Sequence, residues 1–476
     1  MADRRRIATI GGRTASGLIG LGVAVLAVAG ATLLPLPQLA IGVPVQTVRP
    51  VPADQQRVCP GPALELAADA GAATEASAIG EAAVAYGTDG PGAETRRLNP
   101  DAETKLSSQA PLAVAVSTPD GSTTPPLFAG AQVQTVSSPD TAGLAAASCS
   151  EPTADAWLVG GSTALGQTSL VLLSNPTSVD ADVALTIYTE TGRVDAPGAT
   201  GVVVPAGAQK VVALSGFAPS AAAPVVHVTA TGGQVAVSLQ QSFEQGIQPR
   251  GVELTGPTGE PSRTQRMTGV TIASIAAVTA AQSAESVGVE FPVVRILVPG
   301  DKDAKLTIGA VGEAGTAAGS SYARTVKAGS VAEIPLDHLK DGSYTVTVQS
   351  DVPIVAATRT SVIGSKTRDF AWFVSSAPLN GSQFAAIPGG PSPVLHLANP
   401  GEEDVKVTIQ GESGAPIALT VPAEGGANHV LPAGKYTLGG VGGLTASVSF
   451  AADGALSTFP LNPPGALATP IAVYPN

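Results

Sequence analysis

Short stretches of alternating apolar and polar residues recur along most of the chain, separated by glycine, proline, asparagine and aspartate. Such stretches, spaced by about 8 to 12 residues, are typical of β-sandwiches rather than of helices. Three related segments begin at Asp182, Asp303 and Asp404, and read Asp-Val-Ala-Leu-Thr-Ile, Asp-Ala-Lys-Leu-Thr-Ile and Asp-Val-Lys-Val-Thr-Ile. Their starts are 121 and 101 residues apart, which is about the length of one β-sandwich domain.

The similarity between the three segments extends to both sides. Upstream, apolar runs end at Asn175-Pro176, at Pro299 and at Asn399-Pro400, and we expect each strand to stop there because proline cannot donate to a strand ladder. Downstream, each repeat continues with a strand, a tight turn and a second strand. A closing hairpin is then predicted in each repeat, at residues 225–243, 344–360 and 436–450.

The expected fold is all-β, with tandem immunoglobulin-like β-sandwich domains after an N-terminal transmembrane helix. The predicted parts are a cytoplasmic arm and signal-anchor (1–39), an irregular β region (40–150) and three sandwich repeats (151–262, 263–370 and 371–476). In the irregular region, strands are predicted at 45–51, 112–117 and 131–136, and the alanine-rich stretch is a short helix or a loop. Residues 272–280 fit a strand or a helix.

The N-terminal segment has the pattern of a membrane anchor. Four arginines precede an uncharged run: Arg4, Arg5, Arg6 and Arg13. Residues 18–36 are its most apolar part, and as a helix they would span roughly 28 Å, close to the ~30 Å hydrocarbon core. The arginines predict a cytoplasmic N-terminus, with the bulk of the chain outside the membrane. A cleavable signal peptide is the alternative, because residues 27–29 and 29–31 are small-residue cleavage candidates.

Composition and charge narrow the class of protein. Glycine (55) and proline (40) are abundant, and the glycines lack the three-residue period of collagen. The mean hydropathy of +0.27 is too high for wholesale disorder. Without residues 1–39, the chain has 21 basic and 36 acidic side chains. Such an acidic chain, lacking a basic patch, is not expected to bind nucleic acid or anionic lipid headgroups.

The chain has two cysteines, Cys59 and Cys149, and both follow the apolar segment. An even pair in an oxidising compartment predicts one disulfide. Closing this loop would stabilise the fold by about 4 to 5 kcal/mol on the chain-entropy argument. Two free, buried thiols are the alternative.

An acidic cluster precedes the shared strand of each repeat. The clusters are Asp180 and Asp182; Asp301 and Asp303; and Glu402, Glu403 and Asp404. Carboxylates at the end of a sandwich can hold Ca²⁺, but they also fit solvated turns whose charges protect a strand edge. The spacing of an EF-hand is absent from the sequence, which favours the turn.

The histidines and tryptophans fit structural roles. His227, His338, His396 and His429 lie in separate segments without a second metal ligand at short spacing. Alternation places His396 on a core-facing side of its strand, together with Val394 and Ala398. Trp157 and Trp372 occur in similar contexts, which we place at the starts of two repeats. They are expected to fill space between sheets or domains rather than to form a sugar platform.

Four short segments carry a resemblance to a known family. They are Cys59-Pro-Gly-Pro, the region of Cys149, Asp155-Ala-Trp-Leu-Val-Gly-Gly161 and Leu173-Ser-Asn-Pro176. Here the sequence resembles an uncharacterised family of actinobacterial membrane-anchored extracytoplasmic proteins, known as a domain of unknown function. The resemblance implies a secreted or anchored β-protein of the cell envelope. Members are encoded beside membrane glycosyltransferases, which implies a link to envelope glycan assembly, and no catalytic residues carry over.

The functional expectation is a non-enzymatic extracytoplasmic protein of the cell membrane with a scaffolding or binding role. Its predicted partners are the membrane, through the N-terminal helix, and an envelope protein or glycan. The sequence contains no recognisable catalytic motif, so we assign no catalytic, cofactor or metal residues. The loops at Gly160-Gly161, Asn175-Pro176 and Asn399-Pro400 are expected to be structural turns. A glycan-binding adhesin and a carbohydrate-active enzyme are the alternatives, the latter requiring two carboxylates in a cleft.

Overall fold

The structure is a computed structural model. It describes residues 46–48, 54–67, 75–90, 92–101, 104–105, 109–119, 122, 125–285, 291–313, 320–464 and 471–473. The chain forms two compact units. In the first unit, residues 1–49 and 470–476, β1 (Gln46–Val48) pairs antiparallel with β35 (Ile471–Val473). The predicted signal-anchor and its arm lie outside the described residues. Where the chain is described, its helices are too short or too polar to cross a membrane.

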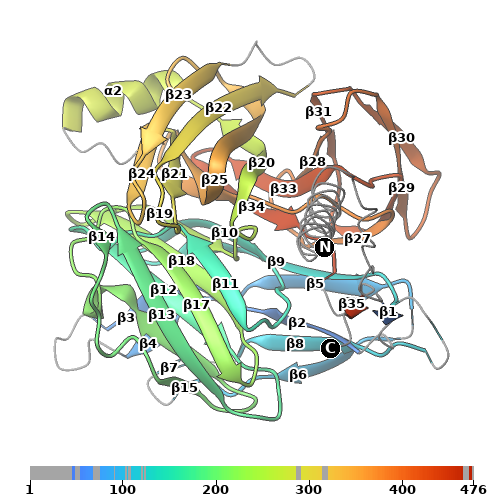
Figure 1. The fold of residues 1–476 in the computed structure, drawn as a ribbon, viewed down its shortest axis with the longest axis horizontal. Helices are drawn as coiled ribbons and strands as arrows, with labels where there is room; N and C mark the ends of the chain where they lie inside the picture. Colours follow the sequence, from blue (N-terminus) through green and yellow to red (C-terminus); the bar gives the residue numbers. More distant parts are fainter. Residues whose placement is uncertain are drawn as a thin grey trace, which may run out of the picture. The chain divides into compact units, whose positions relative to one another are not determined.

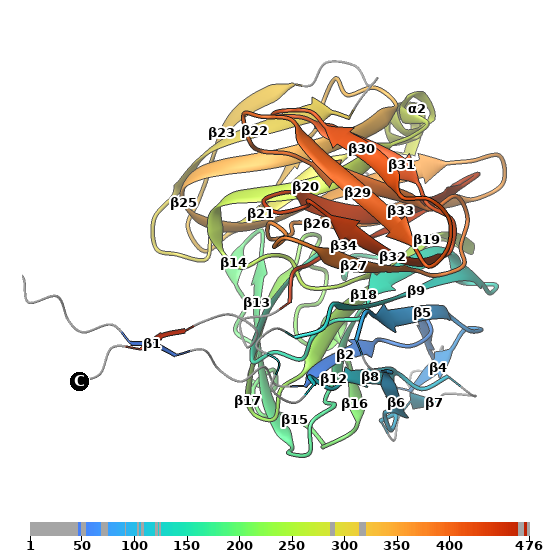
Figure 2. The same cartoon turned by 90° about the vertical axis from the view of Figure 1, so that its right-hand side faces the viewer.

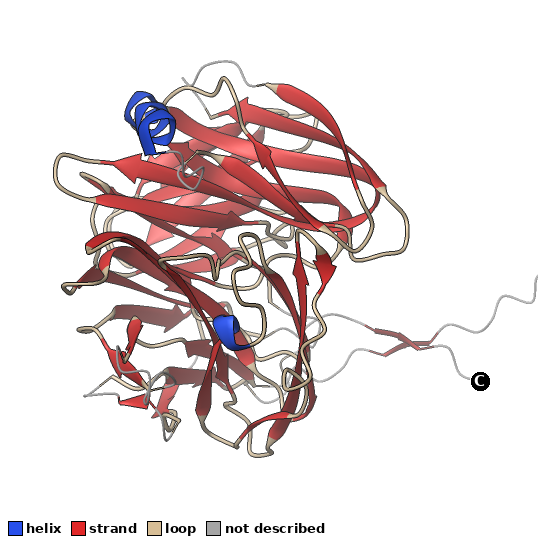
Figure 3. Ribbon diagram, turned by 90° about the vertical axis from the view of Figure 1, so that its left-hand side faces the viewer, coloured by secondary structure: helices blue, strands red, loops and turns tan. Residues whose placement is uncertain are grey.

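The second unit, residues 50–469, is built mostly of strands (Figure 3). We divide it into an N-terminal module and three repeats. The N-terminal module contains β2 (Gln55–Cys59), β3 (Leu64–Leu66), β4 (Ala76–Ala78), β5 (Ala83–Thr88), β6 (Glu94–Arg97), β7 (Thr104–Lys105), β8 (Leu112–Val116), β9 (Phe128–Ser137) and β10 (Ala142–Ser148). The first repeat contains β11 (Asp155–Val159), β12 (Gln167–Ser174), β13 (Ala181–Thr189), β14 (Gly192–Arg193), β15 (Val202–Val204), β16 (Gln209–Ala213), the 3-10 helix η2 (Leu214–Gly216), β17 (Val225–Gly232), β18 (Ala236–Gln245) and β19 (Gln248–Thr255).

The second repeat contains β20 (Ser262–Ile272), α2 (Ile275–Glu285), β21 (Val293–Leu297), β22 (Ala304–Gly312), β23 (Ser321–Val326), β24 (Val331–Pro335), β25 (Gly342–Ile363) and β26 (Arg368–Val374). The third repeat contains β27 (Gln383–Ile387), β28 (Val394–Ala398), β29 (Val405–Gly411), β30 (Ile417–Val421), β31 (Gly426–Val430), β32 (Gly434–Gly439), β33 (Thr445–Ala452) and β34 (Ala455–Leu461). Of the two conformations considered for residues 272–280, the helix is observed, as α2.

The three repeats share one strand order. In the first repeat, one sheet has the order β11-β17-β13 and the other β16-β12-β18-β19. The third repeat has β27-β32-β29 and β31-β28-β33-β34 in the same places. Figure 2 labels β27, β29, β31, β32, β33 and β34 of this repeat. In the second repeat, the first half of the long strand β25 pairs with β20 and β22, and its second half pairs with β21 and β26. The related segments around Leu185, Leu306 and Val407 therefore lie in equivalent strands, β13, β22 and β29.

The N-terminal module follows the same plan, which the sequence pattern did not reveal. Its sheet β2-β8-β6 corresponds to β11-β17-β13, and its sheet β10-β9-β5 corresponds to β19-β18-β12. A small additional sheet, β3-β4-β7, is inserted. The strands predicted at 112–117 and 131–136 are β8 and β9. The prediction of a short helix or a loop is wrong for part of the alanine-rich stretch, which forms the strands β4 and β5.

The predicted closing hairpins are wrong. Strands β17 and β18, which make up residues 225–243, belong to opposite sheets of the sandwich. A chain that crosses from one sheet to the other and a hairpin have the same sequence pattern of two apolar strands around a turn. The last hairpins of the modules are instead β9–β10, β18–β19, β25–β26 and β33–β34.

The four modules follow one another around a common centre (Figure 1). The first repeat shares an apolar cluster with the N-terminal module through β12, β19, β4 and β10. The second repeat packs β21, β25 and β26 on β11 and β17 of the first. The third repeat joins the second through hydrogen bonds such as Ser447 Oγ to the Thr268 carbonyl, 2.7 Å. Phe384 and Ala386 of β27 pack on β9 of the N-terminal module, so the ring is closed.

The last strand of each module lies at the centre of the ring. We call these strands, β10, β19, β26 and β34, the axial strands, and each is in contact with the other three. All four begin at a hairpin turn near one end of the axis. At the other end they lead into the segments that follow the modules, so the strand order alone brings four distant segments of the chain together.

Candidate functional site

One aspartate in each acidic cluster holds a following turn of the chain by a hydrogen bond, and we call these contacts turn staples. The Oδ1 atoms of Asp180, Asp303 and Asp404 each accept a hydrogen bond of 2.8 to 2.9 Å from a backbone N–H of the next turn. The donors are Ala206, Ala328 and Ala423. In the part of the chain that is described, three or more His, Cys, Asp or Glu side chains do not gather into a group that could hold a metal ion.

These staples also correct the alignment of the repeats. Asp180, and not Asp182, is the equivalent of Asp303 and Asp404, because it makes the same hydrogen bond. The sequence match was therefore displaced by two residues in the first repeat. A shift of two preserves the face on which each side chain lies, and this is why the apolar pattern still matched.

The asparagine-proline loops are structural turns, as expected. Asn175 Nδ2 donates to the carbonyls of Val179 and Val204, and Asn399 Nδ2 donates to those of Glu403 and Val421. Both side chains are buried. The repeated Asn-Pro signature is thus explained by the closure of a loop. The Gly160-Gly161 loop lies against the second repeat, where the Gly161 carbonyl accepts from Arg295.

Trp157 and Trp372 are both buried, with exposed fractions of 6% and 1%. They belong to one apolar cluster between the first and second repeats, as expected for residues that fill space between domains. Their positions are not equivalent, however. Trp157 lies in β11, the first strand of the first repeat, whereas Trp372 lies in β26, the last strand of the second repeat, which pairs with β25.

Arg295 is the main polar contact between the first and second repeats. Its guanidinium lies 4.5 Å from the Trp372 ring centroid and donates to the carbonyls of Gly161 (2.7 Å) and Pro224 (2.9 Å). It also pairs with Glu333 at 2.7 Å. Burial lowers the pKa of Arg295, and the nearby Glu333 carboxylate opposes this shift. Arg295 is fully buried in this pair, whereas the Glu333 side chain is 26% exposed.

His396 is a satisfied, buried histidine, as predicted. Its Nδ1 lies 2.9 Å from Glu313 Oε2, and its Nε2 lies 2.8 Å from Ser449 Oγ. This Ser-His-Glu chain has the connectivity of a hydrolase triad. All three side chains are at most 4% exposed, and Gly269 of β20 packs directly against the imidazole. The arrangement joins the second and third repeats and offers no space for a substrate.

Two buried carboxyl groups lie among the axial strands. Asp369 of β26 accepts hydrogen bonds from the backbone N–H groups of Leu144 (2.8 Å), Val252 (3.1 Å) and Leu456 (3.2 Å). Each of the other three modules therefore donates to this carboxyl group. Burial raises the pKa of Asp369 well above its usual value, although the backbone donors oppose the shift.

Glu253 of β19 is the second axial carboxyl group. Its Oε1 accepts from Ser457 Oγ at 3.0 Å, and its Oε2 has no hydrogen-bond partner within the described residues. Burial raises the pKa of Glu253 well above its usual value, and the charge of Asp369 raises it further. Neither carboxyl group was a candidate on sequence grounds, because Glu253 has the pattern of the solvent-facing side of a strand.

A pocket opens where the four axial strands end, and we call it the axial pocket. Its cavity is about 570 Å³, within the range of about 300 to 1,000 Å³ typical of small-molecule sites. The wall is formed by residues 148–151, 257–260, 262, 264–265, 375–378, 460 and 462–464, together with Arg57. The pocket is thus the place where the segments following all four modules meet.

Hydroxyl groups and prolines line much of the axial pocket. Some hydroxyls bond to one another, for example Thr258 Oγ1 to Ser375 Oγ at 2.8 Å. Ser150 Oγ is different, because it is buried and makes no hydrogen bond within the described part of the chain. Such a group has an energetic cost unless water or a ligand satisfies it.

The charges of the axial pocket come from Arg57, Glu151 and Glu260. Arg57 Nη2 lies 2.9 Å from Glu151 Oε1, and the arginine side chain is only 9% exposed. Glu260 is exposed at the rim. One arginine against two glutamates gives the pocket a formal charge of −1.

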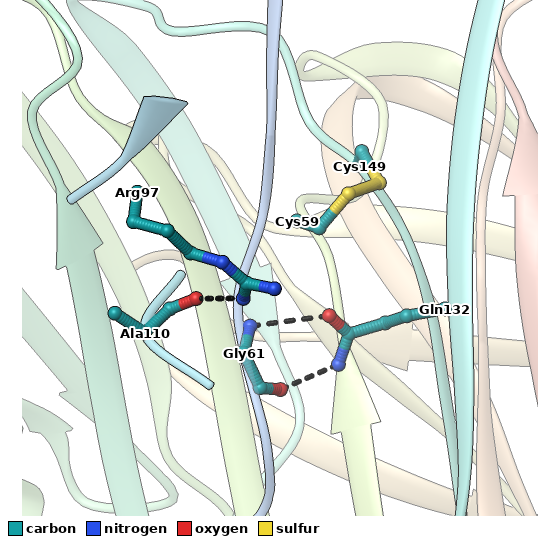
Figure 4. Close-up of a disulfide and its surroundings, with 6 residues drawn as sticks. All are labelled: Cys59, Gly61, Arg97, Ala110, Gln132 and Cys149. Atoms are coloured by element: carbon teal, nitrogen blue, oxygen red, sulfur yellow. Dashed lines mark hydrogen bonds between the residues drawn. A yellow bond between two sulfur atoms is a disulfide. The ribbon is translucent and has the colours of Figure 1, made fainter. Parts of the chain in front are cut away.

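The predicted disulfide borders this pocket. Cys59 and Cys149 are bonded, and Cys149 lines the cavity. Figure 4 shows the segment after Cys59, where the Gln132 side chain accepts from Gly61 N (3.1 Å) and donates to its carbonyl (2.5 Å). The disulfide and the glutamine together fix the segment against β9.

Comparison with known proteins gives a family without a known function. Residues 102–432 match the Family of unknown function (DUF5719). This chain belongs to that family. The match covers more than half of the chain and runs from the N-terminal module into the third repeat. The DUF5719 assignment names no activity, ligand or partner.

Curated proteins and solved structures add little to this assignment. No curated protein matches the DUF5719 chain. A similar solved structure is described as "Crystal Structure of Thermotoga maritima 1070". It is 17% identical with a TM-score of 0.20, over 24% of this chain and 93% of that chain.

Proposed function

We propose that this DUF5719 protein is a non-enzymatic cell-envelope component that binds or scaffolds a partner in the axial pocket. The convergence of four segments on this pocket carries the proposal. Each segment follows an axial strand, and the ring is closed by apolar contacts and buried hydrogen bonds. A closed frame holds such loops in place while their sequences vary, which suits recognition.

We further propose an extracytoplasmic location, with tandem immunoglobulin-like sandwiches anchored by a single-pass N-terminal helix. The buried disulfide supports this location, because structural disulfides persist in oxidising compartments. The arginines before the apolar segment support a cytoplasmic N-terminus. Protease added to intact, wall-stripped cells should digest a C-terminal tag on the full chain. A tag that is protected until the membrane is permeabilised would refute the location.

Affinity capture tests the binding function. The full, tagged chain is extracted from the envelope, and the co-purifying proteins and glycans are compared with those of Ser376→Trp, which places a large side chain in the axial pocket. Ser413→Trp, at an exposed turn of the third repeat, is the matched control. A partner retained by the wild type and the control but lost from Ser376→Trp is the expected result. Recovery of nothing above background would contradict the proposal.

A carbohydrate-active enzyme is the second candidate, because Glu151 and Glu260 border the same pocket. Glycoside hydrolysis uses two carboxyl groups on opposite sides of the scissile bond. Release of reducing sugar from envelope polysaccharide, abolished by both Glu151→Gln and Glu260→Gln, would establish the enzyme and overturn the non-enzymatic function. We expect no release.

A further inference from the structure

The chemistry of the axial pocket restricts the ligand that it can take. The charge of Arg57 is offset by Glu151, although the buried Arg57 Nε has no hydrogen-bond partner within the described residues. Glu260 lies at the rim without a cationic partner in that part of the chain. The formal charge of −1 and the acidic chain around it repel anions. Carboxylate, phosphate and sulfate ligands are therefore disfavoured.

The unpaired hydroxyl group sets a second requirement. Ser150 is 9% exposed, and its Oγ has no partner in the described part of the chain. Ser148 Oγ lies near it, since both are 3.9 Å from the Cβ position of Gly256. Each of these two hydroxyls can donate and accept. A ligand with hydroxyl groups of its own satisfies them, whereas a hydrocarbon leaves a buried polar atom unpaired.

The prolines supply the apolar part of the wall. Pro257, Pro378, Pro460, Pro463 and Pro464 line the cavity. Their rings are apolar surfaces that can contact C–H groups, and they have no backbone N–H to satisfy. Aromatic side chains are not among the described residues of the wall, so recognition would depend on hydroxyl contacts and shape rather than on ring stacking.

We propose that the axial pocket takes a polyhydroxylated ligand of the saccharide class that carries no negative charge. This inference rests on the binding function proposed above. Hydroxyls pair with Ser148 and Ser150, C–H faces lie on the prolines, and the carboxylate of Glu260 discriminates against acidic sugars. The cavity, at about 570 Å³, is large enough to enclose a short oligosaccharide.

Three trisaccharides of different charge test the proposal by isothermal titration calorimetry on the full chain with its disulfide intact. The probes are mannotriose, which is neutral, trigalacturonic acid, which is anionic, and the glucosamine trimer, which is cationic. We expect mannotriose to bind and trigalacturonic acid to bind at least tenfold more weakly. The glucosamine trimer should bind at least as tightly as mannotriose, because the pocket carries a formal charge of −1. Weaker binding of this cationic probe, equal or tighter binding of trigalacturonic acid, or the absence of mannotriose binding would overturn the assignment.

Variants locate the binding in the pocket. Ser150→Ala should weaken mannotriose binding by about two- to tenfold, as expected for one hydrogen bond, and Ser413→Ala should leave it unchanged. Glu260→Gln, at the exposed rim, should reduce the difference in binding affinity between mannotriose and trigalacturonic acid without affecting folding. An unchanged difference, or equal effects of Ser150→Ala and Ser413→Ala, would refute the proposal. If every trisaccharide fails while Ser376→Trp still abolishes partner capture, the ligand class is wrong and the binding function stands.

Discussion

The backbone N–H of Leu144 donates a 2.8 Å hydrogen bond to Asp369 Oδ2, although 225 residues separate the two. The contact joins the N-terminal module to the second repeat. It is possible because the neighbouring residue, Gly143, has no side chain. A Cβ at Gly143 would lie 2.6 Å from Asp369 Oδ1 and 2.8 Å from the backbone nitrogen of Val252.

Gly143→Ala should therefore destabilise the ring. Part of the obstruction is backbone, which cannot rotate away, so we expect a loss of about 1 to 3 kcal/mol, typical of overpacking in a core. Urea unfolding measures this loss in the free energy of unfolding. Gly309→Ala is the control, because an added Cβ at Gly309 meets nothing within 4 Å. Equal stabilities of the two variants would show that the axis tolerates the extra methyl group.

Glu253 should make stability depend on pH. Its pKa is raised in the folded state above the ordinary value of 4.5, so its contribution is fully present below about pH 4.5 and is lost as pH rises through the raised pKa. Glu253→Gln cannot ionise and should lose less stability over that range. The gap between variant and wild type should grow with pH, by about 1.4 kcal/mol for each unit of the shift. Parallel curves from pH 4 to 9 would contradict this, and Glu402→Gln, at an exposed turn, is the control.

Removal of the disulfide should weaken the second unit strongly. The bond between Cys59 and Cys149 closes a separation of 90 residues, and the chain-entropy argument gives about 4 to 5 kcal/mol. The double variant Cys59→Ser with Cys149→Ser should show this loss in denaturant unfolding. Wild type unfolded and refolded in reductant should match the variant, whereas an unchanged midpoint in reductant would show that the covalent link contributes little.

Arg295→Met should separate the first and second repeats. It leaves the buried carbonyls of Gly161 and Pro224 without their donor, whereas Glu333 is partly exposed and keeps Arg359 at 3.8 Å. We expect a loss of about 1 to 3 kcal/mol, as for buried acceptors left unpaired. Arg193→Met, at an exposed position, should change stability by less than about 0.5 kcal/mol. Hydrogen exchange should show the loss of protection in β11 and β21. Protection that is unchanged in both strands would argue against the link.

The sequence predicted the repeated strands well, because their apolar pattern and loop residues are local. The Asn175 and Asn399 turns and the Asp180, Asp303 and Asp404 staples each use partners within about 30 residues. The strand order was harder, since a crossing between sheets and a hairpin have the same local pattern. The N-terminal module was predicted only as an irregular β region, because its alanine-rich strands and inserted sheet obscure the strand order that it shares with the repeats.

The axial carboxyl groups and the axial pocket could not be predicted from the sequence. Alternation around Glu253 assigns its side chain to a solvent-facing side, which would be correct for one isolated sandwich. The closed ring buries that side as well. The pocket in turn depends on four segments that are far apart in the sequence, so no window of residues contains it.

The closed ring also determines the order in which contacts can form while the chain is synthesised from its N-terminus. The N-terminal module can form its disulfide early. The apolar side of β9, however, stays uncovered until Phe384 and Ala386 have been synthesised, and Asp369 lacks one of its donors until Leu456 has been synthesised. Closure therefore comes only when nearly the entire polypeptide has been delivered. A truncated or stalled chain would expose apolar surfaces that the missing modules normally cover, and chaperones and proteases could bind them.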